Sequence, residues 1–453
     1  MKRFNGIALS VAFCSLASQA ALAQTKIDTL KVQNLNEVIV KGVRAAKEAP
    51  YAVANIRKSE LKQFSCSGQE LPFLLSRTPG ILAWSENGIG TGTTYMRIRG
   101  AAGSRINVTL DGVALNSPED QTVFWANMNS YSSLLGSIQV QRGVGSSTNG
   151  DGAFGGSISM ATAAPSLTPT AEVTGSFGSY NTYHTGASFS TGLLGKHLIF
   201  DGAYHETATD GYVDGTAGRS GSYYGGLTWL SDNFKVSYKN IGNFEKTGQA
   251  WNGVLGGDYN SNFTLLEDGI RTYKDMYKAG LDKFNVLTGD MVRNDKGDYT
   301  ITPYTLRDGS KWDKTTDNFY QNHNILSATW TPGSHWSHSL SLHYTYGYGY
   351  YKEFKNNAKF AKFGLIYKDA EGNKVKKSDF IRKKGLTQHT YGMVYNTNYK
   401  DEHWDVIGGL NLQQFRGNHW GYLTYIANQD AEKKFFGSNG QYKYYDCLLY
   451  TSP

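Results

Sequence analysis

Three glycines near residue 150 have the spacing of a nucleotide-binding loop. Gly150, Gly152 and Gly155 form a G-x-G-x-x-G, which cradles a pyrophosphate only where it follows a hydrophobic strand and opens a helix. A polar run of serine, threonine and asparagine precedes these glycines, and polar and apolar residues alternate over residues 157–160. Because alternation with a period of two is typical of a strand, the glycines predict a tight turn between two strands and argue against a nucleotide site.

The other chemistry-bearing residues form no catalytic or metal pattern. His335 and His338 have a spacing that metal ligands use, but they flank Trp336 in a short turn, where an interfacial aromatic belt is expected. No serine stands in a G-x-S-x-G sequence, and no cysteine–histidine or paired-carboxylate constellation emerges. We predict no enzymatic activity, no catalytic residue, no cofactor and no resident metal. A metal ion, where one is involved, arrives inside a substrate.

The chain begins with a secretory signal. Two basic residues precede an apolar run over residues 7–16, and an A-x-A cleavage site ends at Ala23. The run is shorter than the roughly 20 residues that a membrane-spanning helix needs. Of the 3 cysteines, Cys66 and Cys447 follow the cleavage site, and their spacing indicates no disulfide framework. We predict Sec-dependent export and removal of residues 1–23.

The composition favours a membrane protein built from strands. No later segment has the length of an apolar membrane helix, and the mean hydropathy is -0.45. The chain has 31 Tyr, 52 Gly and only 9 Pro, which suits many short strands with aromatic girdles and glycine-rich turns. A net charge of +7 over 453 residues gives no reason to expect nucleic acid as a partner.

Long alternating segments follow residue 169. Leucine or tyrosine occupies every second position from 340 to 350, with serine, histidine, threonine or glycine between, as in a barrel strand with an apolar outer face and a polar inner face. Similar strands are predicted at residues 171–177, 183–191, 198–205, 223–230, 234–242, 318–330, 387–399 and 404–415. Their connections alternate between short (192–196, 231–233, 331–335, 400–403) and long (207–220, 244–317, 351–386). This rhythm indicates a membrane barrel and not a soluble sandwich.

The region before these strands is predicted to be a compact α+β domain. Short helices are expected at residues 59–61 and 69–75, the second ended by the Thr78-Pro79-Gly80 sequence, and strands at 95–99, 106–110 and 138–141. About 120 residues suffice for one small domain.

Three blocks in this domain resemble the plug domain of TonB-dependent outer-membrane receptors. They are M-R-I-R-G at residues 96–100, V-T-L-D-G-V at 108–113 and R-G-V-G-S-S-T-N-G-D-G-A-F-G-G-S-I-S-M at 142–160. The blocks occur in the order of the family. Val144 stands where the family commonly has proline and Asn149 where it commonly has tyrosine, and the glycine-rich core after Asn149 departs from the pattern.

The resemblance implies an α+β plug domain inside a transmembrane antiparallel β-barrel. The complete family barrel has about 22 strands, and only roughly the first nine or ten are expected here. The predicted organisation is a signal peptide (1–23), a periplasmic lead (24–42), a plug (43–164), the N-terminal part of a barrel (165–446) and a tail foreign to the native protein (447–453). We therefore expect a truncated chain that neither inserts into a membrane nor transports by itself.

The resemblance also implies sites for a partner and for a latch. The segment Glu37, Val38, Ile39 and Val40 is similar to a TonB box, which adds a strand to the energy-transducing protein TonB. The alternative, that Val38 to Val40 form the first plug strand, stays open. Arg99 and Arg142 match the family arginines that latch the plug to barrel carboxylates. Ordinary strand-end arginines facing the periplasm are the alternative.

Ligand contacts are expected at the apices of the plug and in the outer loops. The predicted apical contacts are Trp84, Glu86, Asn87, Glu119, Asp120, Gln121, Phe124 and Trp125, and the predicted outer-loop contacts are Trp251, Tyr273 and Tyr277. Basic residues also concentrate in the predicted loop from 352 to 384. They are expected either to steer an anionic chelate inward or to bind lipopolysaccharide phosphate.

The resemblance implies a Gram-negative outer-membrane transporter. Its partners are TonB with its inner-membrane energising complex, outer-membrane lipid and lipopolysaccharide, and a metal-chelate or other small-molecule substrate. A ferric siderophore is favoured over haem, cobalamin or a glycan. The alternative is a plugged surface receptor or adhesin that binds its ligand without energised transport.

Overall fold

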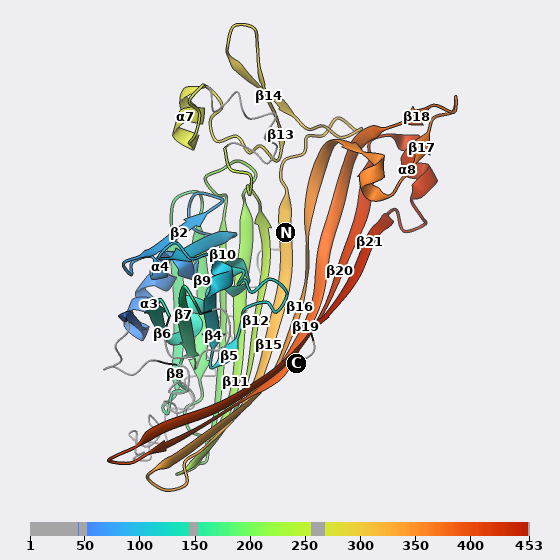
Figure 1. Ribbon diagram of the computed structural model, residues 1–453. Helices are drawn as coiled ribbons and strands as arrows, with labels where there is room; N and C mark the ends of the chain where they lie inside the picture. The colour runs from blue at the N-terminus through green and yellow to red at the C-terminus, as the bar shows by residue number, and fades with distance from the viewer. Residues whose placement is uncertain (1–43, 45–51, 145–152, 255–267, 452–453) are drawn as a thin grey trace.

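The computed structural model describes residues 44, 52–144, 153–254 and 268–451. These residues form a small α+β plug that lies against one face of a large, curved antiparallel sheet (Figure 1). The predicted fold class is confirmed for a plug and a strand-rich wall. Strands β8 and β21 each pair on one side only, so the sheet formed by the described residues is not closed.

The plug is built on a five-stranded mixed sheet with the order β1-β6-β7-β4-β5. Its strands are β1 (Ala52–Arg57), β4 (Ile106–Leu110), β5 (Val113–Ala114), β6 (Leu135–Arg142) and β7 (Gly156–Thr162), and a separate hairpin joins β2 (Ile81–Ser85) to β3 (Thr94–Ile98). Strand β7 runs parallel to β4, whereas the other pairs are antiparallel. The alternating segment after the glycines is therefore a strand, as predicted, and the structure places it at the centre of the sheet.

Short helices cover the plug sheet. They are α3 (Lys58–Ser65), α4 (Leu71–Leu75) and α5 (Tyr131–Leu134), with 3-10 turns η1 (Gly103–Arg105) and η2 (Trp125–Met128). Pro72 fits the first turn of α4 because its missing N–H has no partner there. Apolar residues of α3, α4, β4, β6 and β7 form one buried core with Ile241 of the wall. Plug and wall thus share one core.

The wall is a ten-stranded sheet in which every strand is antiparallel to the next in sequence order. Its strands are β8 (Thr170–Phe177), β9 (Tyr183–Ser190), β10 (Leu198–Thr209), β11 (Gly218–Leu230), β12 (Phe234–Gly248), β15 (Thr316–Trp330), β16 (Trp336–Lys359), β19 (Lys377–Lys400), β20 (Asp405–Ile426) and β21 (Tyr442–Thr451). Each predicted strand is present, and several are longer than predicted. Strand β21 includes residues 447–451, which pair in register with β20.

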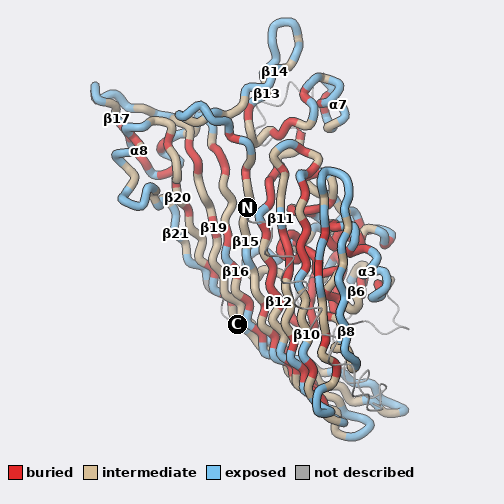
Figure 2. Tube along the Cα trace, turned by 180° about the vertical axis from the view of Figure 1, so that it is seen from behind, coloured by how far each residue is buried: buried red, intermediate tan, exposed pale blue. Residues whose placement is uncertain are grey.

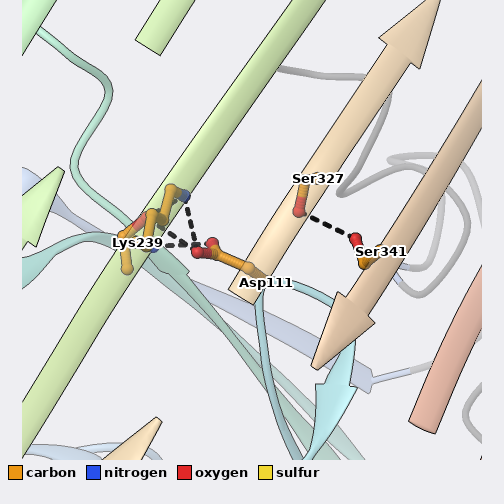
Figure 3. Close-up of polar contacts among 5 residues, drawn as sticks. Asp111, Lys239, Ser327 and Ser341 are labelled. Carbon is orange, nitrogen blue, oxygen red and sulfur yellow. Dashed lines mark hydrogen bonds and ion pairs between the residues drawn. The ribbon is translucent and has the colours of Figure 1, made fainter. Parts of the chain in front are cut away.

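The predicted apolar-out, polar-in pattern is confirmed on β16. Leu342, Tyr344 and Tyr348 are exposed, whereas His343, with the serines and threonine at the alternate positions, is buried. Ser327 of β15 and Ser341 share a 2.9 Å hydrogen bond on the inner face (Figure 3). Buried and less buried positions alternate along the strands when the sheet is seen from behind (Figure 2). The inner face is therefore polar, and the outer face carries the apolar side chains.

Long connections gather at one end of the sheet (Figure 1). They contain α7 (Tyr273–Lys278), the hairpin of β13 (Gly289–Arg293) and β14 (Tyr299–Pro303), η4 (Phe360–Phe363), the hairpin of β17 (Tyr367–Lys368) and β18 (Lys374–Val375), and α8 (Gln429–Phe435). One expectation is wrong: many basic residues assigned to a loop at 352–384 lie on β16 and β19, because these 24-residue strands keep pairing well beyond the 9 to 11 residues that cross a bilayer.

Aromatic rings line the opposite, short-turn end of the wall. Trp229 stacks on His197, and both Trp330 and Trp336 stack on His338. The Nδ1 atom of His338 lies 3.0 Å from the hydroxyl of Tyr395. This histidine therefore belongs to an aromatic belt. None of the helices in the described part of the chain is long and apolar enough to cross a membrane.

Candidate functional site: the contact between plug and wall

The D-G-V sequence forms a two-residue hairpin turn at the surface between plug and wall. Leu110 of β4 pairs with Val113 of β5, and Asp111 and Gly112 both have positive φ, 50° and 85°. Asp-Gly favours such a turn because both residues tolerate left-handed backbone. The Asp111 carboxylate turns back to β7, where it accepts hydrogen bonds from the backbone N–H (3.0 Å) and hydroxyl (2.8 Å) of Thr162.

Lys239 of β12 reaches this carboxylate from the wall. Its Nζ lies 2.7 Å from Asp111 Oδ2 and 2.6 Å from Thr162 Oγ1 (Figure 3). The two charged side chains are only 7% and 13% exposed. Burial by itself raises the pKa of Asp111, but the Lys239 ammonium and the Thr162 donors outweigh it, so the pKa lies below the usual value of an aspartate. The plug is thus joined to the wall by a buried, ionised pair.

Arg44 adds a second cation on the polar face of the plug sheet. It donates to Ser137 Oγ (3.0 Å) and to the Ser159 carbonyl (2.9 Å). Burial lowers its pKa to about 10, opposed by the nearby Asp111 charge. Asp111 therefore has basic groups on both the plug and the wall side.

The β2–β3 hairpin docks its tip on the long loop that follows β12. Glu86 accepts hydrogen bonds from the Tyr95 hydroxyl (2.6 Å) and the Ala250 N–H (3.0 Å), and Thr93 donates to Gln249 Oε1 at 2.8 Å. Burial raises the pKa of Glu86, against these hydrogen bonds. Trp84 stacks on Tyr95 with 5.4 Å between centroids and remains 39% exposed. Glu86 is thus engaged in docking, and Trp84 offers open surface.

Asn87, like Glu86, makes hydrogen bonds that dock the hairpin on the wall. Its side chain is buried, donates to Thr91 Oγ1 and accepts from the Ile89 N–H. Its carbonyl accepts from the N–H of Tyr212, in the loop between β10 and β11. Asn87 holds the apex against the wall.

The predicted ligand contacts of the second apex lie in different environments. Glu119 pairs with His419 of β20 (2.8 Å), and Asp120 closes a local turn on Thr122. Gln121 is exposed with φ of 60°, and Phe124 is 60% exposed. The side chain of Trp125 is only 5% exposed and lies in the plug core. The open surface of this apex is therefore at Gln121 and Phe124, and the ligand role of these residues stays a prediction.

Of the predicted outer-loop contacts, two pack against neighbouring rings and one is exposed. Trp251 packs edge-on against Tyr351 at 5.5 Å, Tyr273 packs against Tyr212 at 6.1 Å, and Tyr277 is 69% exposed. Next to Tyr351, Arg382 pairs with the buried Glu353 at 2.5 Å, and Lys355 binds the same carboxylate at 2.6 Å. Aromatic and basic groups thus meet on the inner face near the long loops.

The predicted latch residues lie elsewhere. Arg99 is exposed in a turn with φ of 49°, and Arg142 donates to the Pro79 carbonyl at 2.8 Å. None of the ion pairs within the described ranges involves either arginine, and their latch role stays a prediction. The TonB-box candidate, Glu37 to Val40, lies outside the described residues.

The sequence does not predict the Asp111–Lys239 pair. Asp111 belongs to a recognisable turn motif, and Lys239 stands at an inward position of a predicted strand. Inward positions of a barrel strand are polar in any case, so a lysine there carries a weak signal.

The similarity of the chain to a known protein family and to solved structures agrees with this geometry. The sequence profile of the TonB-dependent Receptor Plug Domain matches residues 45–157. Residues 45–157 are thus similar to the plug of a TonB-dependent receptor. No curated protein sequence matches the chain. Three solved receptors share the fold of plug and wall. PiuA, a siderophore receptor from Acinetobacter baumannii, has 12% identity and a TM-score of 0.57, and the match covers 95% of this chain and 55% of that chain. BauA, the ferric preacinetobactin receptor from the same species, has 12% identity and a TM-score of 0.57, and the match covers 90% of this chain and 54% of that chain. FpvA from P. aeruginosa, bound to a pyoverdine, has 11% identity and a TM-score of 0.52, and the match covers 85% of this chain and 44% of that chain.

The chain thus spans about half the length of these receptors. At 11% or 12% identity the likeness is one of fold.

Proposed function

We propose that the chain is the plug and first wall segment of an outer-membrane transporter that imports a ferric siderophore with energy from TonB. The observation that carries the proposal is the plug itself, docked on the polar face of the wall by the Asp111–Lys239 pair. A docked plug blocks a pore. Transport then requires that the plug move, and a pull on the N-terminal lead is the route that a TonB box offers.

The inner face of the wall near the long loops, called the rim below, has residues that suit an anionic substrate. Trp251 and Tyr351 provide ring surface there, and Lys384 lies 5.7 Å from the ring of Tyr445. Lys355 and Arg382 share one carboxylate, Glu353, which leaves an excess of positive charge. Aromatic surface with net positive charge suits a large chelate that carries negative charge.

The mechanism assigns one role to each part. Substrate binds to the exposed aromatic residues of the apices, such as Trp84 and Phe124, and to the basic rim. The lead then pairs with TonB through residues 37–40, and pulling separates Asp111 from Lys239. Because both charges are buried, separation must be driven by external work, which keeps the pore shut when TonB is disengaged.

Deleting residues 37–40 in the intact gene tests the energised step. We expect uptake of siderophores loaded with radioactive iron to be lost while binding to whole cells at 0 °C persists. Deleting residues 28–31 of the same lead is the matched control and leaves uptake intact. Uptake that survives deletion of 37–40 contradicts the proposal. Binding without uptake in the unmodified protein favours the plugged receptor or adhesin.

A further inference from the structure

Three asparagines interrupt the apolar outer face of the wall. Asn240 of β12 lies directly opposite Asn324 of β15, which in turn pairs with Tyr344, an exposed outer residue of β16. Asn322 has the same parity as Asn324 on β15, and all three asparagines are partly exposed. Strands β12 and β15 are the two central strands of the wall, with four strands on either side (Figure 2). We call these three residues the outer asparagine cluster.

The cluster lies near the middle of the apolar band. Trp330 of β15 belongs to the aromatic belt at the short-turn end, and Asn324 precedes it by six residues on the same strand. Six residues at about 3.3 Å each, on a strand tilted by about 45°, rise about 14 Å, which is close to half of a hydrocarbon core of about 30 Å. Lipid at that depth offers no hydrogen-bond partner, so a polar side chain there is costly unless protein supplies one.

The asparagines meet most of this demand among themselves. Asn240 Nδ2 donates to Asn322 Oδ1 (3.0 Å) and to Asn324 Oδ1 (2.8 Å). Asn324 Nδ2 donates to Asn322 Oδ1 at 2.7 Å, and Asn322 Nδ2 donates to Asn240 Oδ1 at 3.2 Å. Two tyrosine hydroxyls complete the network: Tyr223 accepts from Asn322 Nδ2 (2.8 Å), and Tyr238 donates to Asn324 Oδ1 (2.6 Å). These bonds lower the cost of the cluster, but three amides still face outward.

Two groups of the cluster keep the capacity to bind a further partner. An asparagine amide has two N–H donors and an oxygen with two lone pairs. Within the described residues, Asn324 uses one of its N–H donors, and Asn240 Oδ1 accepts one hydrogen bond. A spare donor and a spare acceptor thus stand on neighbouring strands. Two identical surfaces related by a two-fold axis satisfy both, because Asn324 of each copy donates to Asn240 of the other.

The surface beside the cluster is open and large enough for such a contact. Gly225 of β11 lies directly opposite Asn240, and a Cβ added there would meet no other described atom within 4 Å, so the glycine leaves a dent. Tyr238, Tyr320 and Leu326 around the cluster are exposed, and tyrosine is enriched where proteins meet. Four strands about 4.8 Å apart, over about 30 Å of hydrocarbon, give roughly 600 Å² per copy and about 1,200 Å² for a pair, which is sufficient for a specific interface.

We propose that the outer asparagine cluster is the centre of a contact between two copies of this chain in the membrane. The inference rests on the proposed outer-membrane location. The two-fold contact places Asn240 and Asn324 of each copy against those of the other and removes the amides from lipid. Polar side chains hold membrane segments together in this way because hydrocarbon offers them no other partner.

Crosslinking in whole cells that express the intact gene tests the contact. Every native cysteine, including Cys66 and Cys447, is replaced by serine, and Leu326→Cys places one thiol beside the cluster. A short bismaleimide is expected to join two copies into a product of twice the monomer mass. Val173→Cys, an exposed outer residue of β8, is the matched control and is expected to remain monomeric.

Replacing the amides by leucine tests their role. Association of fluorescently labelled copies in phosphatidylcholine vesicles is expected to weaken about 10-fold in N240L/N324L, from the loss of two amide hydrogen bonds across the contact. Asn318→Leu, which alters an outer asparagine of β15 toward the long-loop end, is expected to associate as the unmodified protein does. Gly225→Leu fills the dent without changing an amide and is also expected to weaken association.

Three results overturn the inference: no crosslink through Leu326→Cys, equal association of N240L/N324L and the unmodified protein, or a crosslinked product of another mass, which indicates a different membrane protein as the occupant. Heat-dependent mobility in gels confirms that each variant is folded. Association is measured without siderophore or TonB. A protein that pairs but imports nothing refutes the proposed function alone, and one that imports as a monomer refutes only this inference.

Discussion

Replacing Lys239 by methionine tests whether the buried ion pair holds the plug. The substitution keeps much of the side-chain volume and leaves Asp111 buried without its ammonium partner. Removing one partner of a buried pair costs about 3 to 5 kcal/mol. Both side chains are less than one-seventh exposed, so little of this cost is relieved by water. At 1.4 kcal/mol per tenfold, undocking of the plug becomes roughly 150 to 4,000 times more frequent.

Labelling of a buried cysteine measures this opening. Ile241 of β12 is 1% exposed and packs in the core shared with the plug, so Ile241→Cys reacts with a maleimide only after undocking. Cys66 and Cys447 are replaced by serine in the background. The labelling rate is expected to rise by the factor above in K239M, and to remain unchanged in Lys246→Met, which alters an outward lysine of the same strand.

Two further measurements test the role of the Asp111 charge. The D111N/K239M variant has no buried unpaired charge, so its labelling rate is expected to lie nearer the unmodified one than that of K239M. Because the Lys239 ammonium holds the pKa of Asp111 below its usual value in the folded protein, the pair stabilises docking at neutral pH, and this stabilisation is lost as the pH falls through the lowered pKa. Labelling of K239M at the unmodified rate at pH 7 would refute the docking role.

Two substitutions inside the plug give further tests. Burial raises the pKa of Glu70 to about 8, despite a hydrogen bond from Asn129, so stability declines as the pH rises from about 4.5 to about 8. Glu70→Gln is expected to flatten this dependence in urea unfolding at pH 5 and pH 8, and an unchanged slope contradicts it. Gly156 has φ of 151°, and an added Cβ would clash with the carbonyl oxygen of Gln141. Gly156→Ala is expected to cost about 2 kcal/mol or more; Gly103→Ala, with open space around it, shows little loss, and equal urea midpoints for the two argue against the clash.

Much of the wall was predictable because its strands are specified locally. A barrel strand faces two different solvents, so its side chains alternate, and the pattern at residues 340–350 is visible without knowledge of the neighbours. The lengths of the strands were less predictable. Beyond the apolar band, β16 and β19 continue through charged residues such as Lys352 and Lys383 because each supplies the other's ladder partners. Pairing over that stretch depends on the partner strand and leaves no alternation in either sequence.

By itself, the sequence determined a plug motif and alternating strands that require a membrane or a partner sheet, and its signal peptide stays a prediction. Only the tertiary structure decided which residues join plug to wall. Asp111 lies in a turn whose conformation Asp-Gly sets locally, but its partner Lys239 is 128 residues away, and no local pattern encodes that distance. The packing also engages Glu86 and Asn87, two predicted ligand contacts, in hydrogen bonds to two loops that the wall positions.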